Sequence, residues 1–125
     1  MYSAQLLDHF QNPRHAGDLE SADAVAEIEN PVCGDVIRLS LRIVDGRITD
    51  ARFKAKGCVP AIACGSALTE LIVGKTVAEI LRLRRDDVAA AVGGVPQAST
   101  HAAQLAVDVL MGALKKVESN PANQP

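Results

Sequence analysis

Three places in this sequence bring metal-capable side chains to the expected ends of helices or strands, and they supply four residues: Cys33 with Asp35, Cys58, and His101. Cys33 and Asp35 are two residues apart in a Pro-Val-Cys-Gly-Asp segment, and in extended backbone such residues point to the same side. The glycine between them, Gly34, leaves the space around both side chains open. Thiolate, carboxylate and imidazole ligands together suit zinc or an iron–sulfur cluster. The four residues are therefore candidates for one metal centre.

Cys58 and His101 each stand where a helix is expected to begin. Cys58 follows Gly57 at the junction between a strand and a helix. The positive end of a helix dipole favours a thiolate, so we expect a lowered thiol pKa and a better sulfur ligand at this position. His101 belongs to the first turn of the last helix, from which an imidazole can reach outward.

Simpler interpretations of these side chains stay open. A lone cysteine or histidine in an apolar domain is commonly a packed structural residue. That interpretation fits Cys33 and Cys58 less well, because Cys33 lies in a turn segment and Cys58 at a helix start. Asp35 could equally cap a turn, and His101 could equally be a solvated residue of a first turn. No CxxC pair is present, and the candidates are tens of residues apart.

The strands that would position these residues show a period of two. Residues 36–44 alternate between apolar and polar side chains, Asp45-Gly46 is a hairpin signal, and residues 47–56 return as a second strand. Ile48 is out of phase with the apolar set that follows it, so we expect a bulge near Thr49. Residues 25–29 carry a weaker strand pattern. The sequence thus predicts a small antiparallel sheet of about three strands.

The remaining segments have helical periodicity with recognisable caps. Ser3 is a candidate N-cap, and Thr76 stands three residues before Glu79, as in a capping box. The predicted helices are residues 3–10, 61–73, 76–81, 85–92 and about 99–117. Together with the sheet they indicate an α+β fold in which helices pack on one face. We expect one domain over residues 1–118 and a flexible C-terminal tail over residues 119–125.

Composition narrows the class of protein. The 125 residues include 48% hydrophobic but only 2% aromatic side chains, so the core must be built from Leu, Ile, Val and Ala. A net charge of -2 provides no basic field for nucleic acid or an anionic membrane. The N-terminus lacks the pattern of a signal peptide, so we expect a cytoplasmic protein. Its three cysteines should then be thiols or metal ligands, not disulfides.

Several motifs in register resemble the IscU/NifU N-terminal family. They are residues 2–17 with Asp8-His9-Phe10 and Asn12-Pro13-Arg14, Cys33-Gly34-Asp35-Val36, Asp50-Ala51-Arg52-Phe53-Lys54, Lys56-Gly57-Cys58, Thr69-Glu70, Gly74-Lys75-Thr76, and residues 101–108. The similarity covers nearly the whole chain in the order and spacing of the family. Several motifs in register are far more specific than one motif alone.

The resemblance implies both a function and a ligand set. Members are scaffolds that transiently bind a [2Fe-2S] cluster, or zinc when no cluster is present, at positions that match Cys33, Asp35, Cys58 and His101. A cysteine desulfurase supplies the sulfur, and the cluster passes to apo iron–sulfur proteins or carriers. Such a scaffold is expected to be a monomer or a cluster-bridged homodimer.

One position departs from the family pattern. A third cysteine should follow His101 directly, and this chain has Ala102 there. The two remaining thiols, one carboxylate and one imidazole can still complete a four-ligand site. The chain's third cysteine, Cys64, is six residues beyond Cys58 in the predicted helix, a turn of roughly 240° away from the face that Cys58 uses. We interpret Cys64 as a small buried residue rather than a displaced sulfur acceptor.

Two functions are compatible with this pattern. The first is a scaffold or carrier for iron–sulfur clusters with an atypical ligand set. The alternative is a zinc-binding or metal-free interaction protein that binds a desulfurase or another assembly partner without building clusters. An enzyme is not expected, because the sequence contains no nucleophile–base pair, phosphate-binding glycine loop or CxxC redox pair.

Overall fold

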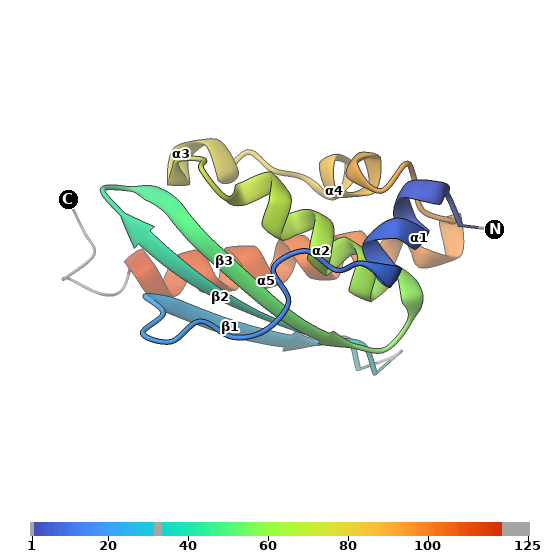
Figure 1. Ribbon diagram of the computed structural model, residues 1–125, viewed down its shortest axis with the longest axis horizontal. Coiled ribbons are helices and arrows are strands. Elements are labelled where there is room, and N and C mark those ends of the chain that lie inside the picture. The colour runs from blue at the N-terminus through green and yellow to red at the C-terminus, as the bar shows by residue number, and fades with distance from the viewer. Residues whose placement is uncertain (1, 32–33, 119–125) are drawn as a thin grey trace.

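The sheet is antiparallel with the strand order β1-β2-β3, as seen in the computed structural model, which describes residues 2–31 and 34–118 (Figure 1). Its strands are β1 (Ala24–Glu29), β2 (Val36–Val44) and β3 (Arg47–Lys56). Asp45 and Gly46 join β2 to β3 with φ angles of 52° and 74°. Positive φ at both central residues is the mark of a tight hairpin turn, so the predicted hairpin is confirmed.

The expected bulge is also present. Arg42 pairs with Asp50 and Ile43 pairs with Ile48, which leaves Thr49 without a partner across the sheet. The extra residue moves Ile48 onto the face that carries Ala51, and both side chains are fully buried. A bulge therefore explains why the apolar pattern of β3 changes phase.

The described residues form five α-helices and one short 3-10 turn besides the sheet. They are α1 (Ala4–Gln11), α2 (Val59–Ile72), α3 (Val77–Ile80), α4 (Arg85–Ala91), η1 (Gln97–Ser99) and α5 (Thr100–Glu118). Helices α2 and α5 lie against one face of the sheet, and α1 and α4 pack on α2 (Figure 1). The α+β fold with helices on one face is as predicted. In the described part of the chain, no helix has the length and apolar character needed to cross a membrane.

The predicted caps form at the helix starts. The Ser3 hydroxyl accepts the Leu6 N–H at 2.9 Å, and Thr76 forms a capping box with Glu79. Each cap satisfies a backbone donor that has no partner within its helix.

The core between sheet and helices is aliphatic, as the composition requires. Its largest fully buried side chains are Leu6, Ile37, Leu39, Leu41, Ile48, Leu68, Ile72, Ile80, Leu110, Val88, Val92 and Val109. Gly65 brings α2 close to β3, because a Cβ at this position would lie 2.7 Å from the ring of Phe53. The close packing fixes the middle of α2 against β3, the strand that leads into it.

Candidate metal centre

A buried carboxylate lies at the middle of the candidate centre. Asp35 directly precedes β2, and its side chain is only 2% exposed. Its Oδ1 accepts the Cys58 N–H at 2.9 Å, and its Oδ2 accepts the Cys58 thiol at 3.2 Å. The same Oδ2 lies 3.2 Å from Nε2 of His101. Asp35 therefore connects the start of β2 to the starts of α2 and α5.

Gly57 makes room for this carboxylate. A Cβ on Gly57 would lie 2.0 Å from Oδ1 of Asp35, and the φ angle of Gly57 is 129°. Side chains are excluded by the contact and disfavoured by the backbone conformation. The sequence pattern around Gly57 predicted only a break between elements. A glycine directly beside a candidate ligand is, however, also a signal of a close approach between backbone and side chain.

Cys58 is the N-cap residue of α2, as expected, but its thiol pKa is raised. Burial is the main cause, and the hydrogen bond and negative charge of Asp35 act in the same direction. The N–H of Ala61 favours the thiolate but does not outweigh them. The expectation of a lowered pKa was therefore wrong, because it considered the helix dipole but neither the burial of the thiol nor the adjacent carboxylate.

The pKa of the Asp35 carboxyl is shifted in the opposite direction, to a lower value. Burial alone would raise the pKa of Asp35, but hydrogen bonds from the Cys58 backbone and thiol and from His101 lower it overall. Asp35 is thus the negative group of the centre, and the Cys58 thiol is protonated beside it. A metal ion that binds here must displace that proton, since the thiolate is the form that binds metals.

His101 lies in the first turn of α5, and its side chain is 30% exposed. It borders an open hollow of about 240 Å³ that also includes Pro31 and Asp108. Because an ionised carboxylate only accepts hydrogen bonds, Nε2 of His101 is the donor in its 3.2 Å contact with Asp35, and binding of a metal through Nε2 would require the proton on Nδ1 instead. The exposed edge of the imidazole gives the centre a route to solvent.

The three side chains fit part of a tetrahedral site. The ligand atoms of Asp35, Cys58 and His101 all lie within 4.8 Å of one another. Zinc bonds of about 2.0–2.3 Å place neighbouring ligand atoms of a tetrahedron about 3.3–3.8 Å apart. The distances of 3.2 Å from Oδ2 to the sulfur and to the imidazole are close to that spacing. The fourth predicted ligand, Cys33, lies outside the described residues.

Two further positions bear on the missing thiol. Cys64 is fully buried, and burial raises the pKa of its thiol to about 12, with the nearby Cys58 as a smaller cause. This agrees with its interpretation as a small core residue. Ala102 is also fully buried, directly beside His101. The methyl group of Ala102 thus occupies core space and offers no ligand atom.

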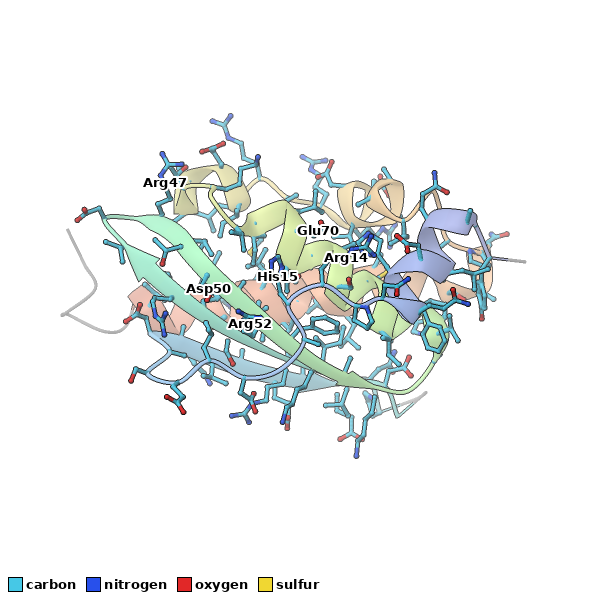
Figure 2. The ribbon with its side chains drawn as sticks, in the orientation of Figure 1. Arg14, His15, Arg47, Asp50, Arg52 and Glu70 are labelled. Carbon is cyan, nitrogen blue, oxygen red and sulfur yellow. The ribbon has the colours of Figure 1, made fainter. Side chains whose placement is uncertain are left out.

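A second polar cluster, which the sequence pattern did not predict, lies between α1 and α2. Nδ1 of His9 is 2.8 Å from the Ser66 hydroxyl, and that hydroxyl accepts the Arg14 N–H at 2.8 Å. Nε2 of His9 is 3.5 Å from Glu70, which Figure 2 shows beside Arg14 on the α2 side of the molecule. Ser66 is buried within an apolar helix, so its spacing gave no sign of this contact.

Comparison with known proteins gives consistent results along the chain. The family model described as the NifU-like N terminal domain matches residues 1–124. Two iron-sulfur cluster assembly scaffold proteins IscU of Archaeoglobus fulgidus are each 46% identical over 114 residues, which is 91% of this chain and 74% of theirs. The nitrogen fixation protein NifU of Cereibacter sphaeroides is 47% identical over 116 residues, 93% of this chain but 47% of its own length.

Solved structures share the fold. A NifU-like N-terminal protein from Brucella abortus superposes with a TM-score of 0.77 at 23% identity, covering 94% of each chain. The assembly scaffold protein SufU from Fervidobacterium islandicum gives a TM-score of 0.73 at 22% identity, covering 90% of this chain and 96% of its own. At these identities the likeness concerns the fold alone.

Proposed function

The chain belongs to the NifU-like N-terminal domain family, and we propose that it is an iron–sulfur cluster scaffold or carrier. It transiently holds a [2Fe-2S] cluster, or zinc or iron before the cluster forms, and then releases it to another protein. The observation that carries the proposal is the convergence of Asp35, Cys58 and His101 within 4.8 Å. Three different ligand types meet at the junctions of three elements, where they are held by the fold rather than by one loop.

The ligand set of this proposal is Cys33, Asp35, Cys58 and His101. Two thiolates, a carboxylate and an imidazole satisfy a zinc ion or a [2Fe-2S] unit. Asp35 has two oxygens with separate roles: Oδ1 is held by the Cys58 N–H at 2.9 Å, while Oδ2 faces the thiol and the imidazole. One oxygen thus fixes the carboxylate, and the other is available as a ligand.

A mixed ligand set suits release of a cluster. Soft thiolates hold iron and zinc firmly, whereas a hard carboxylate oxygen is a weaker partner for the same centre. A proton returned to Cys58 would recover the hydrogen bond to Asp35 that the metal-free protein makes at 3.2 Å. The residues can therefore return to a hydrogen-bonded arrangement after the cargo leaves, as a carrier requires.

The proposal includes partners and a location. A cysteine desulfurase would supply sulfur, and apo iron–sulfur proteins or carriers would receive the cluster, from a monomer or from a homodimer bridged by it. We place the protein in the cytoplasm, where thiols stay reduced.

Ala102 favours a second candidate function. Without a thiol at this buried position, the protein could bind a desulfurase or another assembly partner with zinc, or with no metal, and build no cluster. In this alternative the fold and the protein partners are the same, but no iron–sulfur cluster is bound.

Anaerobic reconstitution separates the two functions. The protein is incubated with ferrous iron and sulfide, and iron, acid-labile sulfide and the visible spectrum are then measured per chain. A scaffold gives stoichiometric iron and sulfide with thiolate-to-iron bands, and Cys33→Ser and Cys58→Ser lose them. Retained zinc with no cluster would contradict the scaffold function and support the partner-binding alternative.

A further inference from the structure

The outer edge of β3 is covered by the chain's own residues in two places. The Phe53 N–H donates to the His15 carbonyl at 3.0 Å, and the Phe53 carbonyl accepts the Gly17 N–H at 2.8 Å. Nearer the start of β3, Ile48 exchanges similar hydrogen bonds with residues 74–75 at 2.9 and 2.8 Å. An edge strand can pair with another chain wherever it is not covered in this way.

The cover ends before Ala55. Alternate residues of an antiparallel strand direct N–H and C=O to the same side, and since those of Phe53 point outward, those of Ala55 do as well. Among the described residues, none pairs with the outward N–H or C=O of Ala55. The covering chain leaves the edge at Gly17, whose φ is 122°, and Asp18 then lies 3.0 Å from Lys54 Nζ.

An open groove borders the uncovered edge. It encloses about 370 Å³, and apolar side chains of Pro13, Ala16, Phe53 and Ile62 line it next to Ala55, together with Lys54. The opposite face of the same strand end carries two exposed lysines, Lys54, which is paired with Asp18 at 3.0 Å, and Lys56. Three features therefore meet at Ala55: backbone groups without partners among the described residues, a largely apolar groove on one face of the strand, and exposed lysines on the other.

We propose that the edge at Ala55 binds an extended segment of a partner protein, which adds to the sheet as a further strand. Side chains of an added strand alternate between its two faces. One set would enter the groove beside Phe53, and the other would face Lys54 and Lys56. The structure thus assigns to the partner a segment in which apolar and acidic residues alternate.

An acidic partner fits this edge better than a second copy of the chain does. Two copies paired edge to edge at Ala55 would bring the lysines at positions 54 and 56 of both copies near one another, and like charges on neighbouring strands repel. Lys56 is followed by Gly57 and Cys58, so a docked segment would lie beside the candidate metal centre. The inference goes beyond the proposed function, because strand addition needs no metal.

Selection from a displayed library of random peptides on the metal-free protein tests the proposal. We expect enriched peptides with alternating apolar and acidic residues. Their affinity should fall by about tenfold or more in Ala55→Pro, which removes the free N–H, and should be unchanged in Ala55→Ser, which keeps it. Proline is tolerated at edge positions whose N–H faces away from the sheet. Enriched peptides without this alternation, or with equal affinity for Ala55→Pro, would overturn the proposal.

Two further measurements decide the matter if Ala55→Pro does not fold. Lys56→Glu reverses the charge of an exposed side chain and should weaken acidic peptides by about tenfold while thermal unfolding stays the same. Hydrogen exchange of the wild-type protein should show new protection of the Ala55 amide when a selected peptide binds. Full affinity in Lys56→Glu, or no added protection at Ala55, would overturn strand addition.

Discussion

The molecule contains two imidazole–carboxylate pairs with opposite burial. In the candidate centre the carboxylate of Asp35 is 2% exposed and the imidazole of His101 is 30% exposed. Between α1 and α2 the imidazole of His9 is 9% exposed and the carboxylate of Glu70 is 48% exposed. One pair therefore buries the negative group, and the other buries the neutral one.

The neighbours of each pair explain the difference in role. Asp35 accepts a hydrogen bond from the Cys58 thiol, with Sγ and Oδ2 3.2 Å apart, and a metal ion can replace the thiol proton. Both nitrogens of His9 are already engaged, one with Ser66 at 2.8 Å and the other with Glu70 at 3.5 Å. Ser66 also accepts the Arg14 N–H, so this cluster fastens the chain after α1 to α2. Asp35, a buried carboxylate beside a thiol, can therefore bind a metal ion. His9, a buried imidazole with both nitrogens occupied, can instead stabilise the packing of α1 on α2.

The largest expected effect is a difference in zinc affinity between substitutions of Cys58 and of Cys64, which lie six residues apart. Cys58→Ser should lower zinc affinity by about 100-fold or more, because it removes a thiolate ligand, whereas Cys64→Ala should leave the affinity unchanged. Competition with a chromophoric chelator measures both variants. Equal zinc affinity of Cys58→Ser and the wild type would remove Cys58 from the site.

A smaller effect is expected for Gly57→Ala. A Cβ at this position would lie only 2.0 Å from Oδ1 of Asp35 and would push the carboxylate away. We therefore expect zinc affinity to fall by about 10- to 100-fold. Gly17→Ala is the matched control, because Gly17 has a similar φ of 122° but no atom within 4 Å of the added Cβ. Similar losses of affinity in the two variants would mean that backbone strain, and not the position of Asp35, is responsible.

The second cluster should affect stability and not the metal. Ser66→Ala leaves the Arg14 N–H without its partner and should lower the unfolding free energy by about 1–3 kcal/mol, with zinc affinity unchanged. His101→Ala should show the reverse: weaker zinc binding and little loss of stability, since its side chain is 30% exposed. Urea denaturation and chelator competition on both variants check the contrast, and a loss of zinc affinity in Ser66→Ala would break it.

The smallest effect is a dependence of stability on pH. Burial is the main cause that lowers the pKa of His9 from 6.5, and the charge of Arg14 adds to it. As the pH falls below 6.5, the unfolded chain therefore binds a proton before the folded one does, and stability decreases. Denaturation at about pH 7.5 and about pH 5.5 should show a larger decrease for the wild type than for His9→Gln. Equal decreases would contradict this assignment.

Local patterns predicted the bounds of each strand and α-helix to within a few residues, but not the short 3-10 turn η1. Residues 36–44 and 47–56 have the bounds of β2 and β3, and even the bulge at Thr49 follows from one apolar residue out of phase. Strand period, turn residues and caps are local properties, so they can be recognised without the tertiary structure.

The site could be predicted only in part. The residue types and the family pattern singled out Asp35, Cys58 and His101, which the structure brings together. The state of the Cys58 thiol and the contact of Gly57 with Asp35 depend on the approach of residues more than twenty positions apart. Such approaches leave no periodic signal, and the same is true of the contact between His9 and Ser66.

Zinc K-edge X-ray absorption of the loaded wild-type protein tests the ligand set most directly. Sulfur and nitrogen or oxygen neighbours of zinc differ in bond length, about 2.3 Å against about 2.0–2.1 Å, so the two kinds of ligand can be counted separately. We predict two sulfur ligands and two nitrogen or oxygen ligands, with one sulfur left in Cys58→Ser and two in Cys64→Ala. A third sulfur in the wild type, or two in Cys58→Ser, would contradict a centre built from Cys33, Asp35, Cys58 and His101.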